Sequence, residues 1–399
     1  MNKKYIMVIA AGSGMICSCL AMGMNLPGLF FSPIAAELGT GRGNVAMTGT
    51  IFNMLLAICG LIVPAVLNRL GLRKTVLLGT VLLVAVTCCF PLCKSLLPMY
   101  LLHAVRGFAS AMMGTVPVTM MLNFWFRKKT ALITSITMCF SGLLSAALSP
   151  VITGIIASFG WRMGYYFCAL VIFLLNCPAI FLPIALRPEE VGFEPYGMEA
   201  AAVQKAETDR SLPIMVLPVI LMLIFNFAVS YITAYAQHLP AIAESRNLAF
   251  AGAMMLSVCM VVNTSAKLVF GIVANGLGAP RASYLYIAGN FIGAILLLKA
   301  GGLGGMTAGA ALLGLSYSLP TIAAASLTRE VFGVENYGRV YPKISLCGTV
   351  AMAAGTSLTG YIYDFTGNYT AALILLAAMA VAAFLSSYLA LNYRKKQSV

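Results

Sequence analysis

Residues 249–273 read A-F-A-G-A-M-M-L-S-V-C-M-V-V-N-T-S-A-K-L-V-F-G-I-V, an apolar run of 25 residues with a single charge, at Lys267. About 20 apolar residues in a helix are enough to cross the hydrocarbon core of a bilayer, so the run predicts a transmembrane helix. A lysine inside such a helix costs at least about 2.5 kcal/mol on insertion scales. Lys267 therefore either faces an internal cavity and binds an anion, or extends its stem to the lipid headgroups.

The rest of the chain repeats this composition. It is 61% hydrophobic and 9% charged over 399 residues, whereas about 25% charged residues are usual in a soluble protein. We therefore predict an all-α membrane protein with twelve transmembrane helices. The predicted spans are 5–30, 44–67, 75–94, 97–121, 130–156, 163–186, 212–236, 249–273, 282–299, 304–327, 341–363 and 370–391.

Basic residues are distributed unequally between the loops on the two sides. With the N-terminus inside, 17 of the 25 Lys and Arg residues fall on the inner side and 5 on the outer side. Because short cytoplasmic loops carry an excess of such residues, both termini are predicted to lie in the cytoplasm. The expected location is the cytoplasmic (plasma) membrane, crossed many times. The net charge of +14 then reflects topology, and no nucleic-acid partner is expected.

A polar linker and an internal repeat divide the chain. Residues 187–211 form the one long polar connection, so we predict a six-helix bundle over 1–186, a cytoplasmic linker and a second bundle over 212–399. Asn68-Arg-Leu-Gly71 recurs as Asn275-Gly-Leu-Gly278, 207 positions later. Six spans separate the two copies, so the repeat is parallel, and two pseudo-symmetric bundles are typical of major facilitator transporters.

Three motifs extend this resemblance to the major facilitator superfamily. Gly60 to Lys74 resembles its loop motif, with Asn68 in place of the usual acid. Arg106-Gly107 in span four is similar to the buried arginine motif of the family. Ser145 to Gly154 in span five resembles a small-residue pattern associated with antiporters, which favours exchange, although small residues also serve ordinary helix packing.

A closer resemblance is to monocarboxylate porters and bacterial oxalate/formate antiporters. Four segments carry it: 123–129, 160–162, 187–193 and 361–369. The resemblance implies a small carboxylate as substrate. In that branch span eight carries an Asp and an Arg four residues apart, and here the pair is Asn263 and Lys267. The retained cation implies anion binding, and the lost acid favours exchange or uniport over proton symport.

Acidic residues support an anionic cargo. None of the 11 Asp and Glu residues lies deep in a predicted span, and Asp364 is placed at the outer end of span eleven. A cation in a span is then best neutralised by a substrate carboxylate. One cation in the pocket favours a monocarboxylate, whereas two or more suit a dicarboxylate.

Further pocket residues are predicted with an alternative for each. Arg106 and Lys343 are each expected to add positive potential to the pocket. The alternative for Arg106 is that it binds backbone carbonyls of neighbouring helices, and the alternative for Lys343 is that it extends to the membrane surface. Tyr317, Tyr231 and Asn25 either line the pocket or satisfy helices broken beside Pro320 and Pro27. Tyr317 is favoured, because aromatic residues of span ten flank the substrate in oxalate relatives. His103 is expected to be a packed or lumen-edge residue rather than a proton relay, and His238 is expected to be a loop residue.

The sequence thus predicts a secondary transporter of a small organic anion, working by alternating access in the bilayer as a monomer. The alternatives are an exporter of neutral drug-like or metabolite compounds and a transport-silent membrane sensor. The chain lacks a metal-ligand cluster, a nucleophile–base motif and a phosphate-binding loop, so we expect no enzyme activity, no cofactor and no metal.

Overall fold

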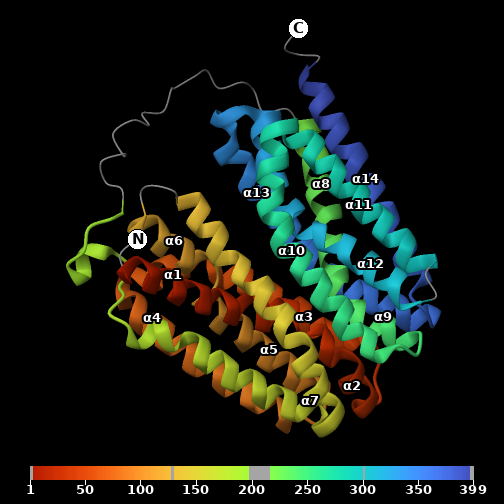
Figure 1. Ribbon diagram of the computed structural model, residues 1–399, viewed down its shortest axis with the longest axis horizontal. Coiled ribbons are helices and arrows are strands. Elements are labelled where there is room, and N and C mark those ends of the chain that lie inside the picture. Colours follow the sequence, from red (N-terminus) through yellow and green to blue (C-terminus); the bar gives the residue numbers. More distant parts are fainter. Residues whose placement is uncertain (1–2, 127–129, 197–215, 300–301, 396–399) are drawn as a thin grey trace. The chain divides into compact units, whose positions relative to one another are not determined.

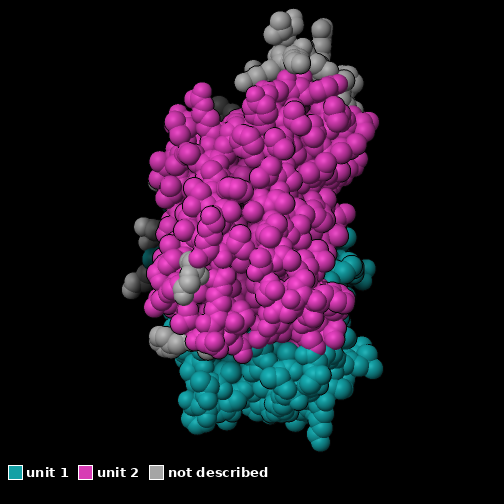
Figure 2. Space-filling view, turned by 90° about the vertical axis from the view of Figure 1, so that its right-hand side faces the viewer, with its two compact units in different colours: residues 1–40, 47–206 teal, residues 41–46, 207–399 magenta. Residues whose placement is uncertain are grey.

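The computed structural model describes residues 3–126, 130–196, 216–299 and 302–395, and this part of the chain is helical almost throughout (Figure 1). Two compact units divide the chain, coloured separately in Figure 2. Unit 1 contains residues 1–40 and 47–206, and unit 2 contains residues 41–46 and 207–399. Of the predicted linker, residues 197–211 lie outside the described residues. Its first part packs on unit 1, where the Tyr196 amide donates to the Trp125 carbonyl over 2.8 Å.

Twelve membrane spans are consistent with the helices. Among the described residues, nine helical stretches are long and apolar enough to cross a bilayer. One of them, Ile133–Phe181, holds two predicted spans separated at Gly160. The fourth predicted span is broken at residues 112–114 into two shorter helices, and the eleventh follows Gly333 within one long helix. Together these observations account for all twelve.

Several helices of unit 1 pack against its longest helix, residues 130–181. Its elements are α1 (Lys3–Ile16), the π-helix η1 (Cys17–Asn25), α2 (Gly28–Leu38), α3 (Arg42–Gly60, of which 42–46 group with unit 2), α4 (Val63–Cys89), η2 (Phe90–Leu92), α5 (Leu96–Ala111), α6 (Thr115–Trp125), α7 (Thr130–Phe181) and η3 (Pro188–Val191). Both α1 and η1 pack on α7.

Unit 2 has the same general plan. Its elements are α8 (Val216–Tyr235), η5 (Ala236–His238), α9 (Leu239–Ser245), α10 (Ala249–Leu277), α11 (Ala279–Lys299), α12 (Leu303–Gly314), η6 (Leu315–Ser318), the π-helix η7 (Leu319–Ala323), α13 (Ala324–Thr366) and α14 (Thr370–Lys395). Here α8 packs against α13 and α14. The helix α10, which carries Lys267, packs against α12 and η6.

The repeated sequence turn has a repeated backbone. Gly71 has φ 74° and ψ 166°, and Gly278 has φ 85° and ψ 151°. This region is essentially restricted to glycine, because a side chain would clash with the backbone. The repeat therefore reflects a sharp reversal between two long helices in each unit.

Small residues allow close helix contacts within unit 2. A β carbon on Gly355 would lie 2.9 Å from the Tyr231 ring, and the Asn226 amide donates to the Ile344 carbonyl over 2.7 Å. The antiporter-like stripe in unit 1 includes Ser145 and Ser149, both completely buried. Small buried residues thus allow close helix packing in each unit.

Candidate functional site

Lys267 lies in the middle of α10, beside an aromatic ring. It precedes the end of the helix by ten residues, about 15 Å along the axis and so near the midplane of a core about 30 Å thick. Its side chain is half-buried, and Nζ lies 5.9 Å from the centroid of the Tyr317 ring. A cation at this distance from a ring face is attracted to it, more strongly where water is excluded.

Tyr317 is positioned by a break in its own helix. After Gly314 the α12 helix tightens into η6 and then widens into the π-helix η7, which contains Pro320. A β carbon on Gly314 would lie 2.5 Å from the Cys259 carbonyl oxygen of α10, so the two helices approach very closely there. The close approach and the break together place the Tyr317 ring near the Lys267 ammonium.

Asn263 completes this group one helical turn before Lys267. Its side chain is 1% exposed, and its amide nitrogen lies 3.8 Å from the Met260 sulfur, which is a weak acceptor. Among the described residues its Oδ1 has no hydrogen-bond partner. An unpaired buried polar atom costs about 1–3 kcal/mol, so this amide is suited to a ligand. The amide oxygen and nitrogen exchange places by rotation, which lets it either accept or donate.

We call Asn263, Lys267 and Tyr317 the Lys267 cluster. Two buried hydroxyls of η6, on Ser316 and Ser318, likewise have no hydrogen-bond partner within the described part of the chain. The Ser316 carbonyl accepts from the Thr233 hydroxyl of α8 over 3.2 Å, which ties η6 to the neighbouring helix. The sequence analysis did not single out these serines, although their place next to Tyr317 and Pro320 was a usable signal.

Arg106 is held by the π-helix of unit 1. Its side chain is 2% exposed, and Nη2 donates to the Met22 carbonyl of η1 over 2.7 Å. The guanidinium also lies 5.9 Å from the Phe52 ring and 5.7 Å from the Phe90 ring. A π-helix disrupts the regular pairing of carbonyls, so Arg106 stabilises the backbone there. Its Nε has no hydrogen-bond partner among the described residues, so one donor remains available.

Substitution of Arg106 tests whether the residue stabilises the backbone of η1 or contacts the substrate. We expect Arg106→Met to lower the thermal stability of the solubilised protein, because the Met22 carbonyl loses its donor at a cost of about 1–3 kcal/mol. Anion affinity per folded molecule is expected to persist. Thermal unfolding and ligand binding on the same sample test this. A variant of unchanged stability that no longer binds the anion would instead identify Arg106 as a substrate contact.

Asn25 and Tyr231 make hydrogen bonds between helices of their own units. The Asn25 amide donates to the Ser145 hydroxyl over 3.0 Å, and the Tyr231 hydroxyl lies 3.2 Å from the Thr359 hydroxyl. Both side chains are buried. Lys343 is exposed on α13, and the structure gives it no hydrogen bond or ion pair within the described residues. Of the seven predicted site residues, Asn263, Lys267 and Tyr317 are therefore the three that are brought together.

The structure agrees with the prediction for one of the two histidines and not for the other. His103 is buried against the Phe90 ring, 4.3 Å between centroids, which is the packed one of its two expected positions. The prediction that His238 lies in a loop is wrong. It is completely buried in η5, with Nε2 2.7 Å from the Thr356 carbonyl oxygen, because the chain turns inward between α8 and α9.

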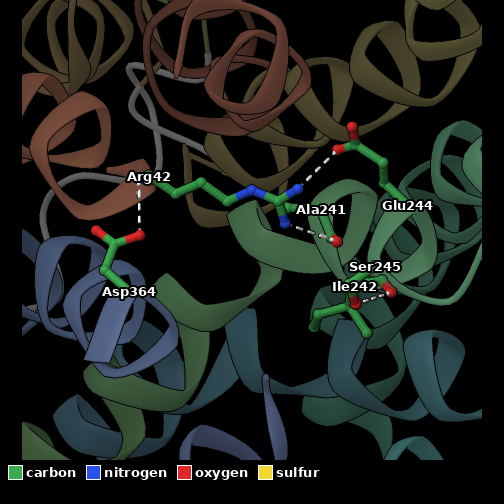
Figure 3. Close-up of polar contacts among 6 residues, drawn as sticks. All are labelled: Arg42, Ala241, Ile242, Glu244, Ser245 and Asp364. Carbon is green, nitrogen blue, oxygen red and sulfur yellow. Dashed lines mark hydrogen bonds and ion pairs between the residues drawn. The ribbon is translucent and has the colours of Figure 1, made fainter. Parts of the chain in front are cut away.

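A network around Arg42 was missed from the sequence (Figure 3). Within unit 2, the Asp364 carboxylate accepts from the backbone amide of Arg42 over 2.9 Å. It also accepts from the backbone amide of Gly43 over 2.7 Å. The Arg42 guanidinium donates to the Ala241 carbonyl over 3.2 Å and pairs with Glu244 over 3.3 Å. Asp364 thus caps the start of α3, where the helix dipole favours a negative charge.

Unit 1 contains an equivalent of this network at the repeat position. Glu37 lies 207 positions before Glu244, and it pairs with Arg162 and accepts from the Trp161 indole over 2.5 Å. The hydrogen bond from Arg162 lowers the pKa of the Glu37 carboxyl. Arg162 is fixed further by the Pro91 carbonyl, 2.9 Å from Nε. In unit 1 the arginine lies just before the sixth predicted span, whereas in unit 2 it comes from residues 41–46.

The chemistry available at these positions is that of binding. Among the described residues, no group of three or more His, Cys, Asp or Glu side chains is arranged to hold a metal ion. The Lys267 cluster instead offers a cation, an amide and an aromatic wall, which together suit a small anion.

Several curated proteins are similar to this chain over most of its length. Rat monocarboxylate transporter 4 (Rattus norvegicus) is 22% identical over 388 residues, covering 93% of this chain and 80% of the relative. Human monocarboxylate transporter 11 (Homo sapiens) is 27% identical over 333 residues, covering 78% and 67%. Bovine monocarboxylate transporter 13 (Bos taurus) is 24% identical over 364 residues, covering 89% and 82%.

Solved structures share the fold. A bacterial homologue of the human lysosomal transporter Spinster, inward-facing and occupied, aligns with a TM-score of 0.70 over 97% of this chain and 96% of that one. The nucleoside transporter NupG aligns with a TM-score of 0.73 over 96% and 99%. Both are 12% identical to this chain, so they bear on the fold alone. The Major Facilitator Superfamily profile matches residues 12–341, and the chain belongs to that superfamily.

Proposed function

We propose that this protein carries a small organic anion, a mono- or dicarboxylate, across the cytoplasmic membrane by alternating access. The observation that carries the proposal is the Lys267 cluster, in which a half-buried ammonium near the midplane adjoins a buried amide with an unused oxygen and an aromatic ring. The superfamily makes the chain a multi-pass membrane transporter and not an enzyme. The names of its relatives, monocarboxylate transporters, support this choice of substrate class.

Each residue of the cluster has a separate task in the proposal. The Lys267 ammonium neutralises the carboxylate, and at about 4 Å with an effective dielectric of about 20 the pair is worth about 4 kcal/mol before desolvation. The Asn263 amide donates a second hydrogen bond to the same group. Tyr317 flanks the organic part and excludes water. Because one cation forms the cluster, a monocarboxylate is the preferred cargo.

Exchange or uniport is proposed over proton symport. The position that holds an acid in the related porters holds Asn263 here, and an amide takes up no proton in the physiological range. The bound anion then neutralises Lys267 without a proton, and the carrier returns loaded with another anion or empty. The excess of basic residues in alternate loops supports an orientation with both termini in the cytoplasm.

Counterflow into proteoliposomes tests the proposal. Vesicles loaded with an unlabelled short carboxylate are expected to accumulate the labelled form, and other short carboxylates are expected to compete. The corresponding amides, equal in shape but uncharged, are expected not to compete. Equal competition by the amides would reject an anion site, and uptake driven by a pH gradient into empty vesicles would reject exchange and uniport in favour of symport.

A further inference from the structure

A groove runs along unit 2 between α11 and α14, which lie side by side (Figure 1). Its volume is about 750 Å³. The lining is apolar apart from Arg281 and Tyr284, and includes Leu285, Phe291 and Phe384. Leu285 is 55% exposed, so the groove opens to the surroundings of the bundle and not to its interior. In a membrane-spanning bundle, such a surface is covered by lipid chains.

One end of the groove carries a cation without a protein partner. Arg281 is the third residue of α11 and is exposed. Within the described residues the structure gives its guanidinium no hydrogen bond and no ion pair, in contrast to Arg42, Arg106 and Arg162. A guanidinium binds phosphate through two parallel hydrogen bonds. Its position at a helix start adds to this, because the helix dipole favours an anion there and opposes a lone cation.

The length of the groove matches one lipid chain in one leaflet. From Arg281 to Ile292 there are eleven residues, about 16 Å at 1.5 Å per residue. Half of a hydrocarbon core of about 30 Å is about 15 Å. The groove therefore extends from the depth of the headgroups to the midplane and no further. Arg281 also lies on the side where the basic loops gather, and the cytoplasmic leaflet is the one rich in anionic lipids.

We propose that this groove binds one anionic phospholipid, with its phosphate on Arg281 and one acyl chain between α11 and α14. The apolar lining of the groove contacts the acyl chain, and the Arg281 guanidinium favours a headgroup that carries a negative charge. Basic pockets between transmembrane helices on the cytoplasmic side are known as headgroup sites in general. This binding site is separate from the Lys267 cluster and does not depend on what the protein carries.

Lipid binding to the full-length protein in detergent tests the proposal. Phosphatidylglycerol is expected to bind about tenfold more tightly than phosphatidylcholine with the same chains, measured by native mass spectrometry and by thermal shift. Arg281→Gln is expected to remove this preference. Arg329→Gln, at an exposed arginine of the same unit outside the groove lining, is the matched control and is expected to keep it.

A groove-filling variant and a competition experiment complete the test of the lipid site. Ala288→Trp fills the groove from an exposed position and is expected to weaken both lipids. Glycerol phosphate alone is expected not to compete, because it lacks the chain. Equal binding of the two lipids to the unmodified protein would overturn the proposal even if Arg281→Gln failed to fold. So would loss of the preference in Arg329→Gln, unchanged lipid binding in Ala288→Trp, or competition by glycerol phosphate.

Discussion

Lys267→Gln is expected to reduce carboxylate counterflow by about twentyfold or more while the protein remains folded. The charge pair with the substrate is worth about 4 kcal/mol before desolvation, and each 1.4 kcal/mol corresponds to a factor of ten in affinity. Even when half of that energy is offset by desolvation, the affinity falls more than tenfold, and the transported flux falls with it. Initial rates of labelled carboxylate uptake, normalised to folded protein in each vesicle preparation, measure the effect.

Variants of the same cluster separate charge from shape. Lys267→Arg keeps the cation and is expected to retain part of the flux, although the planar guanidinium fits the site differently from a point charge. Tyr317→Phe keeps the ring, whose centroid lies 5.9 Å from Nζ, and is expected to transport nearly normally. Tyr317→Leu removes the ring and is expected to reduce affinity by about twofold to thirtyfold, since a cation–π contact is worth about 0.5–2 kcal/mol.

Lys299 provides the matched control for charge removal. It lies at the last residue of α11 and is exposed, in the same unit as Lys267. Lys299→Gln makes the same chemical change outside the cluster, so counterflow is expected to be unaffected. If Lys267→Gln transports as well as the Lys299→Gln protein, the lysine extends to the headgroups and takes no part in binding.

The features predicted from sequence are those that leave a local pattern. Apolar runs give the twelve spans, and the offset of 207 between Asn68 and Asn275 gives the paired turns at Gly71 and Gly278. Asn263 and Lys267 share a helix face because they are four residues apart. The resemblance to major facilitator transporters is confirmed by the family profile, and monocarboxylate transporters are among the curated proteins similar to this chain. In each case a short window or a known family pattern was sufficient.

The features that were missed depend on contacts between distant parts of the chain. Arg42 and Asp364 are 322 residues apart, and neither belongs to a motif that predicts their contact. The binding of a helix carbonyl by Arg106 was one of its two expected roles, but the π-helix at Cys17–Asn25 that supplies the carbonyl was missed, because a widened helix leaves no signal in hydrophobic periodicity. His238 was placed in a loop because it follows the apolar run. Its burial arises from the short turn η5, whose contacts with α13 are not encoded locally.

Asp364→Asn is expected to increase hydrogen exchange of the Arg42 and Gly43 amides by ten- to a hundredfold. The aspartate accepts from both amides with separate oxygens, over 2.9 and 2.7 Å, while the asparagine side chain offers one neutral acceptor. A hydrogen bond to a charged group is worth about 1.5–3 kcal/mol, and local opening follows that energy. Hydrogen–deuterium exchange of peptides that cover residues 40–46 measures it in the intact protein.

Glu244→Gln is expected to have a smaller effect on hydrogen exchange at residues 42–43 than Asp364→Asn, and this difference identifies the helix cap. Glu244→Gln breaks the Arg42 ion pair, but the Glu244 side chain is 44% exposed, and exposed pairs contribute about 0–1 kcal/mol. Arg42 also keeps its bond to the Ala241 carbonyl and its contact with the Tyr363 ring, 4.5 Å away. Glu244→Gln is therefore expected to change exchange at residues 42–43 by less than about fivefold, well below the effect of Asp364→Asn.

Glu37→Gln is the control in unit 1, because it changes the repeat-equivalent acid and leaves residues 41–46 untouched. It is expected to leave exchange at residues 42–43 unchanged, since Glu37 pairs with Arg162. If Glu37→Gln accelerates that exchange as much as Asp364→Asn does, the effect is a general loosening of the protein and not the loss of a helix cap. If Asp364→Asn leaves exchange unchanged, the start of α3 is held by packing of Gly43 against Tyr361, where a β carbon would lie 2.5 Å from the ring.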